Sequence, residues 1–192
     1  MTLLYGLVLA GGQSRRMGRD KALLERDGQS LLATAAGLLD AVCGEVFVSV
    51  REATSEGERA RWPQIADRYG GLGPADGIVS AMSRFPTRGW LVLACDLPRL
   101  SAATLQSLVA QRDTSCDATA FRSLRDDLPE PLCAIYEPSS LTTMQSYLAR
   151  DVRCPRKMLL NMNTHLLAPA AADALANANT PDDWAELGGR AL

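Results

Sequence analysis

Short apolar segments alternate with segments of helical spacing over the first 111 residues, and this alternation constrains the fold more than any other feature. The apolar segments 3–9, 46–50 and 90–94 are typical of buried strands, and residues 64–66 suit a brief fourth one. Helical spacing predicts helices at residues 31–42, 51–61, 74–84 and 101–111. Strands that alternate with helices predict a mostly parallel sheet covered on both faces.

The second half is less regular but is expected to complete the same fold. Its expected strands and helices are strands 117–121, 132–136 and 165–167 (an edge strand) and helices 139–150, 155–161 and 181–187. Gly44 is expected to cap the first helix of the chain, and Thr180 is expected to begin the last. Neither repeats nor linker-like composition interrupt the sequence. We therefore predict one domain over residues 1–192, with a Rossmann-like three-layer fold.

Composition and charge exclude several classes of protein. With 47% hydrophobic residues and a net charge of −2, the chain is not expected to bind nucleic acid or a membrane through a broad surface. No Lys or Arg precedes the apolar segment 3–9, and no run approaches roughly 18 apolar residues, so neither a secretory signal nor a membrane span is expected. The five scattered cysteines favour reduced thiols in the cytoplasm over disulfides or a zinc site.

Residues 9–21, LAGGQSRRMGRDK, carry the strongest functional signal. The adjacent glycines Gly11 and Gly12 allow the backbone to approach a ligand and to point N–H groups at phosphate oxygens. Four cations follow within seven positions, which suits a triphosphate: Arg15, Arg16, Arg19 and Lys21. The segment matches neither the P-loop nor the dinucleotide-binding glycine pattern. A glycine turn followed by a solvated charged loop is the alternative interpretation.

Two further unusual segments, 67–73 and 95–98, also follow predicted strands. Because ligands bind at the carboxyl ends of parallel strands, we expect both segments to converge with residues 9–21. Asp96 would then be well placed to hold Mg²⁺ beside a cationic phosphate-binding loop. Each segment also has a purely structural interpretation, as an aspartate before a turn and as a glycine-rich turn that caps the next helix.

The pattern L-A-G-G-x-S-x-R-M-G-x-D-K resembles the signature loop of the molybdenum-cofactor guanylyltransferases, MobA-like members of the wider nucleotidyltransferase superfamily. The resemblance implies a mostly parallel central sheet flanked by helices, of the nucleotide-diphospho-sugar transferase type. The nucleotide contacts that it implies in this loop are Leu9, Ala10, Gly11, Gly12 and Lys21. Arg15 matches the basic part of the loop, and the candidate catalytic residues are therefore Lys21, Arg15 and Asp96.

Other matches extend along most of the chain. The sequence L-A-C-D-L-P resembles the family's strand with a metal-binding aspartate, which makes Asp96 the implied Mg²⁺ ligand. Asp67, followed by G-P-x-x-G, is implied to help bind the guanosine part of the nucleotide. Ser49 falls where some relatives carry a nucleotide-contacting Asn. Asn177 and Asn179 belong to a segment that resembles the family's N-x-N-T-P-x-[DE], which returns to the mouth of the active site.

The reaction that the resemblance implies is transfer of GMP from GTP to the terminal phosphate of molybdopterin or its molybdenum-loaded form, with Mg²⁺ as cofactor and pyrophosphate as product. Proteins of cofactor biosynthesis or molybdoenzyme maturation are candidate partners. Three alternatives stay open. The first is a cytidylyltransferase for the same cofactor, which generally shows L-A-A-G at this loop. The second, a sugar-phosphate nucleotidyltransferase, is a more distant relative of the matched pattern. The third is a catalytically silent nucleotide-binding protein that delivers or guards the cofactor.

Overall fold

A seven-stranded sheet runs through the middle of the part of the chain that the structure describes. The structure is a computed structural model that describes residues 3–10, 20–71, 73–168 and 174–176. In spatial order the strands are β5 (Gln64–Ala66), β4 (Glu45–Val50), β1 (Leu4–Leu9), β6 (Gly89–Ala94), β8 (Pro129–Tyr136), β7 (Ala118–Arg122) and β9 (Thr164–Leu167). Strand β8 runs antiparallel to both of its neighbours, and the other pairs are parallel. The mostly parallel sheet predicted from the sequence is confirmed.

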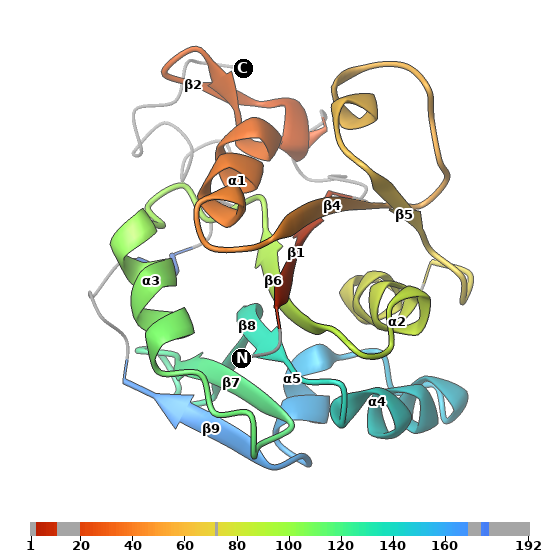
Figure 1. Cartoon of the computed structure of the whole chain (residues 1–192), viewed down its shortest axis with the longest axis vertical. Helices are drawn as coiled ribbons and strands as arrows, with labels where there is room; N and C mark the ends of the chain where they lie inside the picture. Colours follow the sequence, from red (N-terminus) through yellow and green to blue (C-terminus); the bar gives the residue numbers. More distant parts are fainter. Residues whose placement is uncertain (1–2, 11–19, 72, 169–173, 177–192) are drawn as a thin grey trace.

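Helices cover both faces of this sheet and make the fold a three-layer one (Figure 1). One face carries α1 (Leu31–Asp40) and α3 (Ala102–Ala110), and the other carries α2 (Pro74–Arg84), α4 (Ser140–Ala149) and α5 (Pro155–Leu159). The side chains of Ser30 and Ser101 accept the backbone N–H groups of Ala33 and Thr104, which begins α1 and α3. The three layers expected from the sequence are confirmed. None of the helices within the described ranges is long and apolar enough to cross a membrane.

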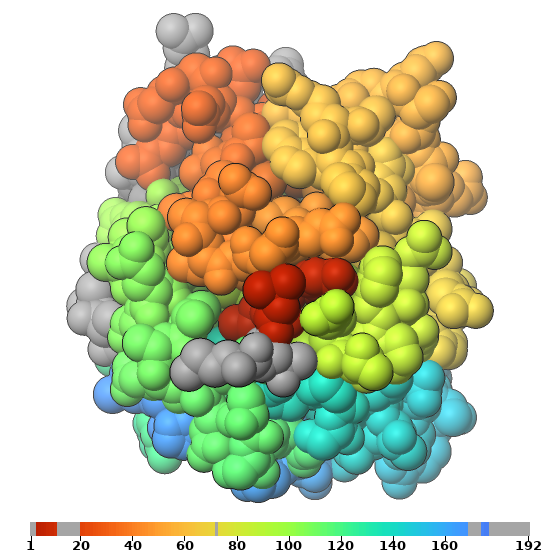
Figure 2. Space-filling model, viewed as in Figure 1, coloured from red at the N-terminus to blue at the C-terminus, as the bar shows by residue number. Residues whose placement is uncertain are grey.

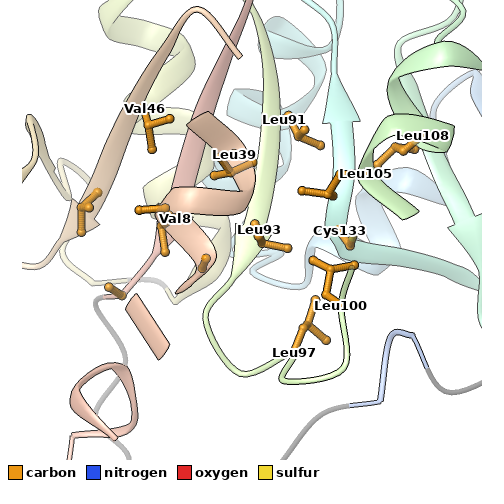
Figure 3. Packing of buried hydrophobic residues seen from close by; sticks show 14 of the residues in the cluster. Val8, Leu39, Val46, Leu91, Leu93, Leu97, Leu100, Leu105, Leu108 and Cys133 are labelled. Atoms are coloured by element: carbon orange, nitrogen blue, oxygen red, sulfur yellow. The ribbon is translucent and has the colours of Figure 1, made fainter. Parts of the chain in front are cut away.

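The layer under α1 and α3 is an apolar core that reaches the carboxyl end of β6 (Figure 3). Leu39 and Leu105 point from the two helices toward the sheet, where Val8 and Leu93 are likewise buried. Each such side chain contributes roughly 1.5–3 kcal/mol by leaving water. Leu97 belongs to the same core, so the segment just after β6 is anchored by apolar packing.

The opposite layer contains an aromatic cluster near the amino ends of the parallel strands. Tyr5 and Trp90 lie with ring centroids 5.6 Å apart in an edge-on arrangement, and Phe47 and Phe85 complete the cluster. In Figure 2 the start of β1 reaches the surface between the segment that leads into β4 and the segment that leads into β6. This is therefore the face at which the parallel strands begin, and their carboxyl ends lie at the opposite edge of the sheet.

Two local predictions are wrong. Residues 51–61 form no helix beyond the short 3₁₀ helix η2 (Glu58–Arg61), because Gly57 takes a φ of 75° and Thr54 hydrogen-bonds to nearby groups instead. Gly44 does not cap α1, which ends at Asp40. A Cβ at Gly44 would lie 2.5 Å from the exposed side chain of Leu3, which would have to move.

A hairpin that was not predicted, formed by β2 (Glu25–Arg26) and β3 (Gln29–Ser30), follows a second 3₁₀ helix, η1 (Lys21–Leu23). Its signal in the sequence is the adjacent pair Asp27 and Gly28, which is typical of two-residue hairpin turns. The turn of this hairpin has two residues with positive φ, Asp27 and Gly28. The closing helix predicted at 181–187 lies outside the described residues.

Candidate active site

The register of neighbouring strands brings the predicted site residues to one edge of the sheet. Leu9, the last residue of β1, lies opposite both Ser49 of β4 and Ala94 of β6. Strand β5 pairs in parallel with β4, so Asp67 after β5 and Asp96 after β6 leave the sheet at this same edge. Their proximity therefore follows from strand pairing between segments that are far apart in the sequence.

A pocket of about 290 Å³ opens at this edge, near the lower end of the roughly 300–1,000 Å³ typical of small-molecule sites. Its lining residues are Leu9, Ala10, Asp20, Lys21, Ala22, Ser49, Arg51, Asp67, Gly71, Gly73, Pro74, Ala94, Cys95, Asp96 and Leu132. Every predicted site residue within the described ranges lies in this pocket. The predicted residues Gly11, Gly12, Arg15, Asn177 and Asn179 lie outside the described residues.

Lys21 and Asp96 form a partly buried ion pair in the pocket. The Lys21 Nζ atom lies 3.5 Å from Asp96 Oδ2, and the two side chains are 16% and 20% exposed. Lys21 is the first residue of η1, whose start is capped by the carboxylate of Asp20, which accepts the N–H of Ala22 at 3.1 Å. Because both side chains are largely buried, water weakens their electric field less than it weakens that of an exposed ion pair.

One carboxylate oxygen of Asp96 fits a metal ion. Its Oδ1 atom is buried and accepts no hydrogen bond from the described residues. A buried oxygen of this kind is unfavourable until a ligand or ion satisfies it. Within the described ranges, no three His, Cys, Asp or Glu side chains are grouped so that they could hold a metal by themselves. The donor set therefore suits Mg²⁺, which takes one or two carboxylates and completes its coordination with water and substrate phosphates.

Asp67 lies across the pocket and is half-buried between β4 and α2. Burial, and then the negative charge of Asp76, raise the pKa of Asp67 to about 6. The Ser49 hydroxyl, 3.4 Å from Asp67 Oδ1, and the nearby Arg51 oppose this rise. Near neutral pH the Asp67 carboxylate is ionised and accepts hydrogen bonds, whereas mild acid protonates it.

The loop that follows Asp67 is organised by a second, fully buried carboxylate, Asp76 on α2. Its oxygens accept backbone N–H groups from Arg68 at 3.0 Å, from Tyr69 at 3.1 Å and from Gly71 at 2.9 Å. The hydroxyl of Ser80 donates a fourth hydrogen bond at 2.9 Å. Gly70, Gly71 and Gly73 all take positive φ values, which the turn around this carboxylate requires. This side of the pocket is therefore held by hydrogen bonds within the protein.

Ser49 is held between Asp67 and the glycine Gly77 of α2. A Cβ atom at Gly77 would collide with Ser49 Oγ and would lie 3.0 Å from Leu9 Cδ2. The glycine thus lets α2 approach the ends of β1 and β4 closely enough to bury Ser49. Ser49 lines the pocket as expected, and its hydroxyl donates a hydrogen bond to the Asp67 carboxylate.

Several lining residues were not predicted from the sequence. Leu132 reaches the pocket because β8 is antiparallel, and its neighbour Cys133 pairs with Leu93, near the end of β6. Arg51 and Asp20 also line the pocket, at points where their strand or turn meets it. Burial raises the pKa of the Cys95 thiol to about 12, so this lining residue stays protonated and is no nucleophile.

The sheet order, the pocket at the carboxyl ends of the strands and the Lys21–Asp96 pair define a nucleotide-binding α/β protein. Comparison with protein families is more specific, because residues 6–166 match the MobA-like NTP transferase domain. The chain belongs to this family. The family resemblance inferred from the loop at residues 9–21 and the nucleotidyltransferase class are thus confirmed.

Known relatives resemble the chain over almost its whole length. A molybdenum cofactor biosynthesis bifunctional protein of Synechocystis is 35% identical over 97% of this chain, and the chain spans about half of that protein, 54% of its length. A molybdenum cofactor guanylyltransferase of Xanthomonas euvesicatoria is 34% identical, with 95% of this chain and 93% of the relative covered. The crystal structure of molybdopterin-guanine dinucleotide biosynthesis protein A from Archaeoglobus fulgidus shares the fold, with a TM-score of 0.79 at 24% identity and coverages of 95% and 96%.

Proposed function

We propose that the chain transfers GMP from GTP to the terminal phosphate of molybdopterin, or of its molybdenum-loaded form, and releases pyrophosphate. Membership of the family supports nucleotidyl transfer, and the names of the relatives support a molybdenum-cofactor acceptor. The observation that carries the proposal is the arrangement of one pocket, in which the Lys21–Asp96 pair lies on one side and the carboxylate of Asp67 on the other. That arrangement suits a triphosphate at one end and a nucleoside at the other.

The proposed step is an in-line displacement at the α-phosphorus of GTP. An oxygen of the acceptor phosphate forms a bond to the α-phosphorus, and the bond from that phosphorus to the oxygen bridging the β-phosphate breaks. The attacking phosphate is already an anion, so no side chain has to remove a proton. Catalysis then consists of positioning and of charge stabilisation. The Lys21 ammonium offsets negative charge on the α-phosphate and on the departing pyrophosphate.

Asp96 is the residue that would hold Mg²⁺, through its buried Oδ1 atom. When bound there, the ion would supply Lewis-acid stabilisation of phosphate oxygens. The neighbouring Lys21 lies close enough to act on the same phosphates, since only 3.5 Å separates its Nζ from Asp96 Oδ2. Asp96 would thus serve the proposed reaction in two ways, by holding Mg²⁺ and by pairing with Lys21.

On the other side of the pocket, the ionised Asp67 accepts hydrogen bonds from the nucleoside. Guanine suits a carboxylate, because adjacent ring and amino N–H groups both donate, whereas cytosine offers one amino group beside acceptor atoms. The loop that follows Asp67 is held by Asp76, and its residue Gly71 lines this end of the pocket. The proposal therefore assigns guanine recognition to Asp67 and its loop, and phosphate chemistry to Lys21 and Asp96.

The test is an incubation of the protein with Mg²⁺, molybdopterin and each of the four ribonucleoside triphosphates in turn, with pyrophosphate as the measured product. We expect release with GTP and a larger rise in melting temperature with Mg²⁺-GTP than with Mg²⁺-CTP, Mg²⁺-UTP or Mg²⁺-ATP, since a ligand that binds the folded state stabilises it. Preference for CTP would replace the proposal by the cytidylyl alternative. Binding of GTP without pyrophosphate release would indicate a silent nucleotide-binding protein.

We also propose that the protein acts in the cytoplasm. The five cysteines are free thiols in the structure, as a reducing compartment requires. The proposed partners are proteins of cofactor biosynthesis or molybdoenzyme maturation, which would supply molybdopterin and accept the dinucleotide. The measurement that tests these partners is a pull-down with the full chain in the presence and absence of GTP.

A further inference from the structure

Arg59 touches both ends of the cationic segment, although the mechanism above does not use it. Its Nε and Nη2 atoms donate to the carbonyl oxygen of Ala10 at 3.2 and 2.7 Å. The same Nη2 atom lies 2.7 Å from Asp20 Oδ2. Ala10 is the residue that follows β1, and Asp20 immediately precedes Lys21, so one guanidinium joins the two points that flank residues 11–19. Those nine residues lie outside the described ranges.

The segment that carries Arg59 is itself anchored at a fixed place. Arg59 belongs to η2, and the preceding residue, Glu58, accepts a hydrogen bond from the hydroxyl of Ser30. Ser30 also caps α1 by accepting the N–H of Ala33, so η2 is fastened to the start of that helix. The Arg59 side chain is only 17% exposed. A planar guanidinium held in this way can serve two acceptors at once, which a lysine ammonium on a flexible stem does poorly.

Three short contacts link Arg59 to the Lys21–Asp96 pair. Arg59 binds the Asp20 carboxylate, whose Oδ1 atom accepts the N–H of Ala22, while the Asp20 carbonyl accepts the N–H of Leu23 at 3.1 Å. These hydrogen bonds form the turn that contains Lys21. Ala10, Asp20 and Lys21 line the pocket. Arg59 therefore binds two residues of the pocket wall, Ala10 and Asp20.

We propose that Arg59 is a positioning residue for nucleotidyl transfer: by bridging Ala10 and Asp20 it sets the place of Lys21 beside Asp96. This inference rests on the proposed function. Because a misplacement of about 1 Å at a reacting centre can cost on the order of 10²-fold in rate, a residue behind the wall can matter as much as one that touches the substrate. Removing Arg59 would also leave the Asp20 carboxylate without its cation, close to the anionic substrate.

The experiment is a double-mutant cycle on the full chain with Arg59→Ala, Lys21→Ala and the combined variant, assayed by pyrophosphate release and by calorimetric binding of Mg²⁺-GTP. The matched control is Arg61→Ala, which removes an exposed arginine from the same turn, and melting temperatures check that every variant is folded. We expect Arg59→Ala to lower kcat about 10- to 100-fold. In the Lys21→Ala background the same change should cost less than about 3-fold, because residues that act as a unit are not additive.

An equal loss in both backgrounds, or an equal loss in Arg61→Ala, would overturn the inference, since Arg59 would then act on stability or on the substrate rather than through Lys21. If Arg59→Ala does not fold, Arg59→Gln takes its place in the cycle. If the wild type releases no pyrophosphate, the proposed function fails, and crystal structures of the wild type and Arg59→Gln decide the inference instead. A shift of Lys21 away from Asp96 by about 1 Å or more supports it, and an unchanged Lys21 overturns it.

Discussion

The two sides of the pocket are built in different ways. Lys21 and Asp96 belong to segments far apart in the sequence, and their alignment depends on Arg59, which contacts a residue 49 positions earlier in the chain. The Asp67 side is local, because Asp76 binds backbone groups only five to eight positions away. In the proposed reaction, the first side would present charges whose attraction grows as pyrophosphate departs, and the second would present a loop that meets the nucleoside equally before and during the reaction. We therefore expect changes on the first side to lower kcat and changes on the second to raise KM.

The largest effect is expected from Asp96→Asn. The amide has nearly the same volume but lacks the negative charge that Mg²⁺ requires, so kcat should fall on the order of 10³-fold while the fold is retained. Titrations of wild type and variant with Mg²⁺, together with circular dichroism, provide the measurement. Near-normal turnover and metal dependence would show that Asp96 is not the ligand and would remove the metal from this side of the pocket.

Lys21→Ala should have the next largest effect, a loss of about 10²–10³-fold in kcat with a smaller change in GTP binding. The charge that Lys21 meets increases as the bond to pyrophosphate breaks, so its contribution is greatest in the transition state. Lys21→Arg should restore little, since a planar fork does not reproduce a compact ammonium. Steady-state kinetics of both variants will decide. A higher KM at unchanged kcat would mean that this side of the pocket merely holds GTP.

Asp76→Asn tests the loop that follows Asp67. The amide nitrogen cannot accept the backbone N–H groups that a carboxylate oxygen accepts, so the free energy of unfolding should fall by about 1.5–3 kcal/mol in urea titrations. We expect KM for GTP to rise roughly 10-fold with kcat nearly unchanged, because the loop acts in binding. The control is Asp27→Asn, at an exposed turn. If Asp76→Asn lowers kcat instead of raising KM, the Asp67 side of the pocket acts in the reaction step and not in GTP binding alone.

The smallest effect concerns the ionisation of Asp67. Its pKa of about 6 lies above the ordinary aspartate value of 3.8, so KM for GTP should rise as the pH falls through 6 and the carboxylate takes up a proton. The free energy of unfolding depends on pH in the opposite sense, because protonation of Asp67 favours the folded state. The folded state holds the proton more firmly, so the free energy of unfolding decreases as the pH rises from about 4 to about 6.

Asp67→Asn should flatten both pH profiles, measured by steady-state kinetics and by urea titration between pH 4 and pH 8. In Asp76→Asn the midpoint of the KM profile should move to lower pH, because the charge of Asp76 contributes to the raised pKa. A wild-type KM that does not vary between pH 5 and pH 8 would show that nucleotide binding does not need the ionised carboxylate.

Much of the fold and the central site residues could be predicted because they depend on local patterns. Continuous apolar runs indicate buried parallel strands, and such strands place their following loops at one edge of the sheet. That rule brought Asp67 and Asp96 to the same edge as Ala10. It requires no knowledge of side-chain contacts, only of strand direction.

The supporting residues could not be predicted in this way. Arg59 lies in a segment whose charged, Glu- and Arg-rich composition resembles an exposed helix, and its contact with Ala10 exists only in the folded chain. Asp76 reads as an ordinary acidic residue in the first turn of a helix, yet it is fully buried. Leu132 reaches the pocket only because β8 enters the sheet in the opposite direction, which an apolar run does not specify.

The position of β8 has a consequence for the making of the protein. Strand β6 is buried at the centre of the finished sheet, and one of its edges pairs with β8, which the ribosome completes roughly 40 residues later. At about 5–20 residues per second, that edge of a wholly apolar strand stays unpaired for roughly 2–8 seconds during translation. Unpaired apolar strands recruit other chains. The nascent N-terminal half, which already carries Lys21, Asp67 and Asp96, is thus the stage at which this edge of β6 is open to pairing with another chain.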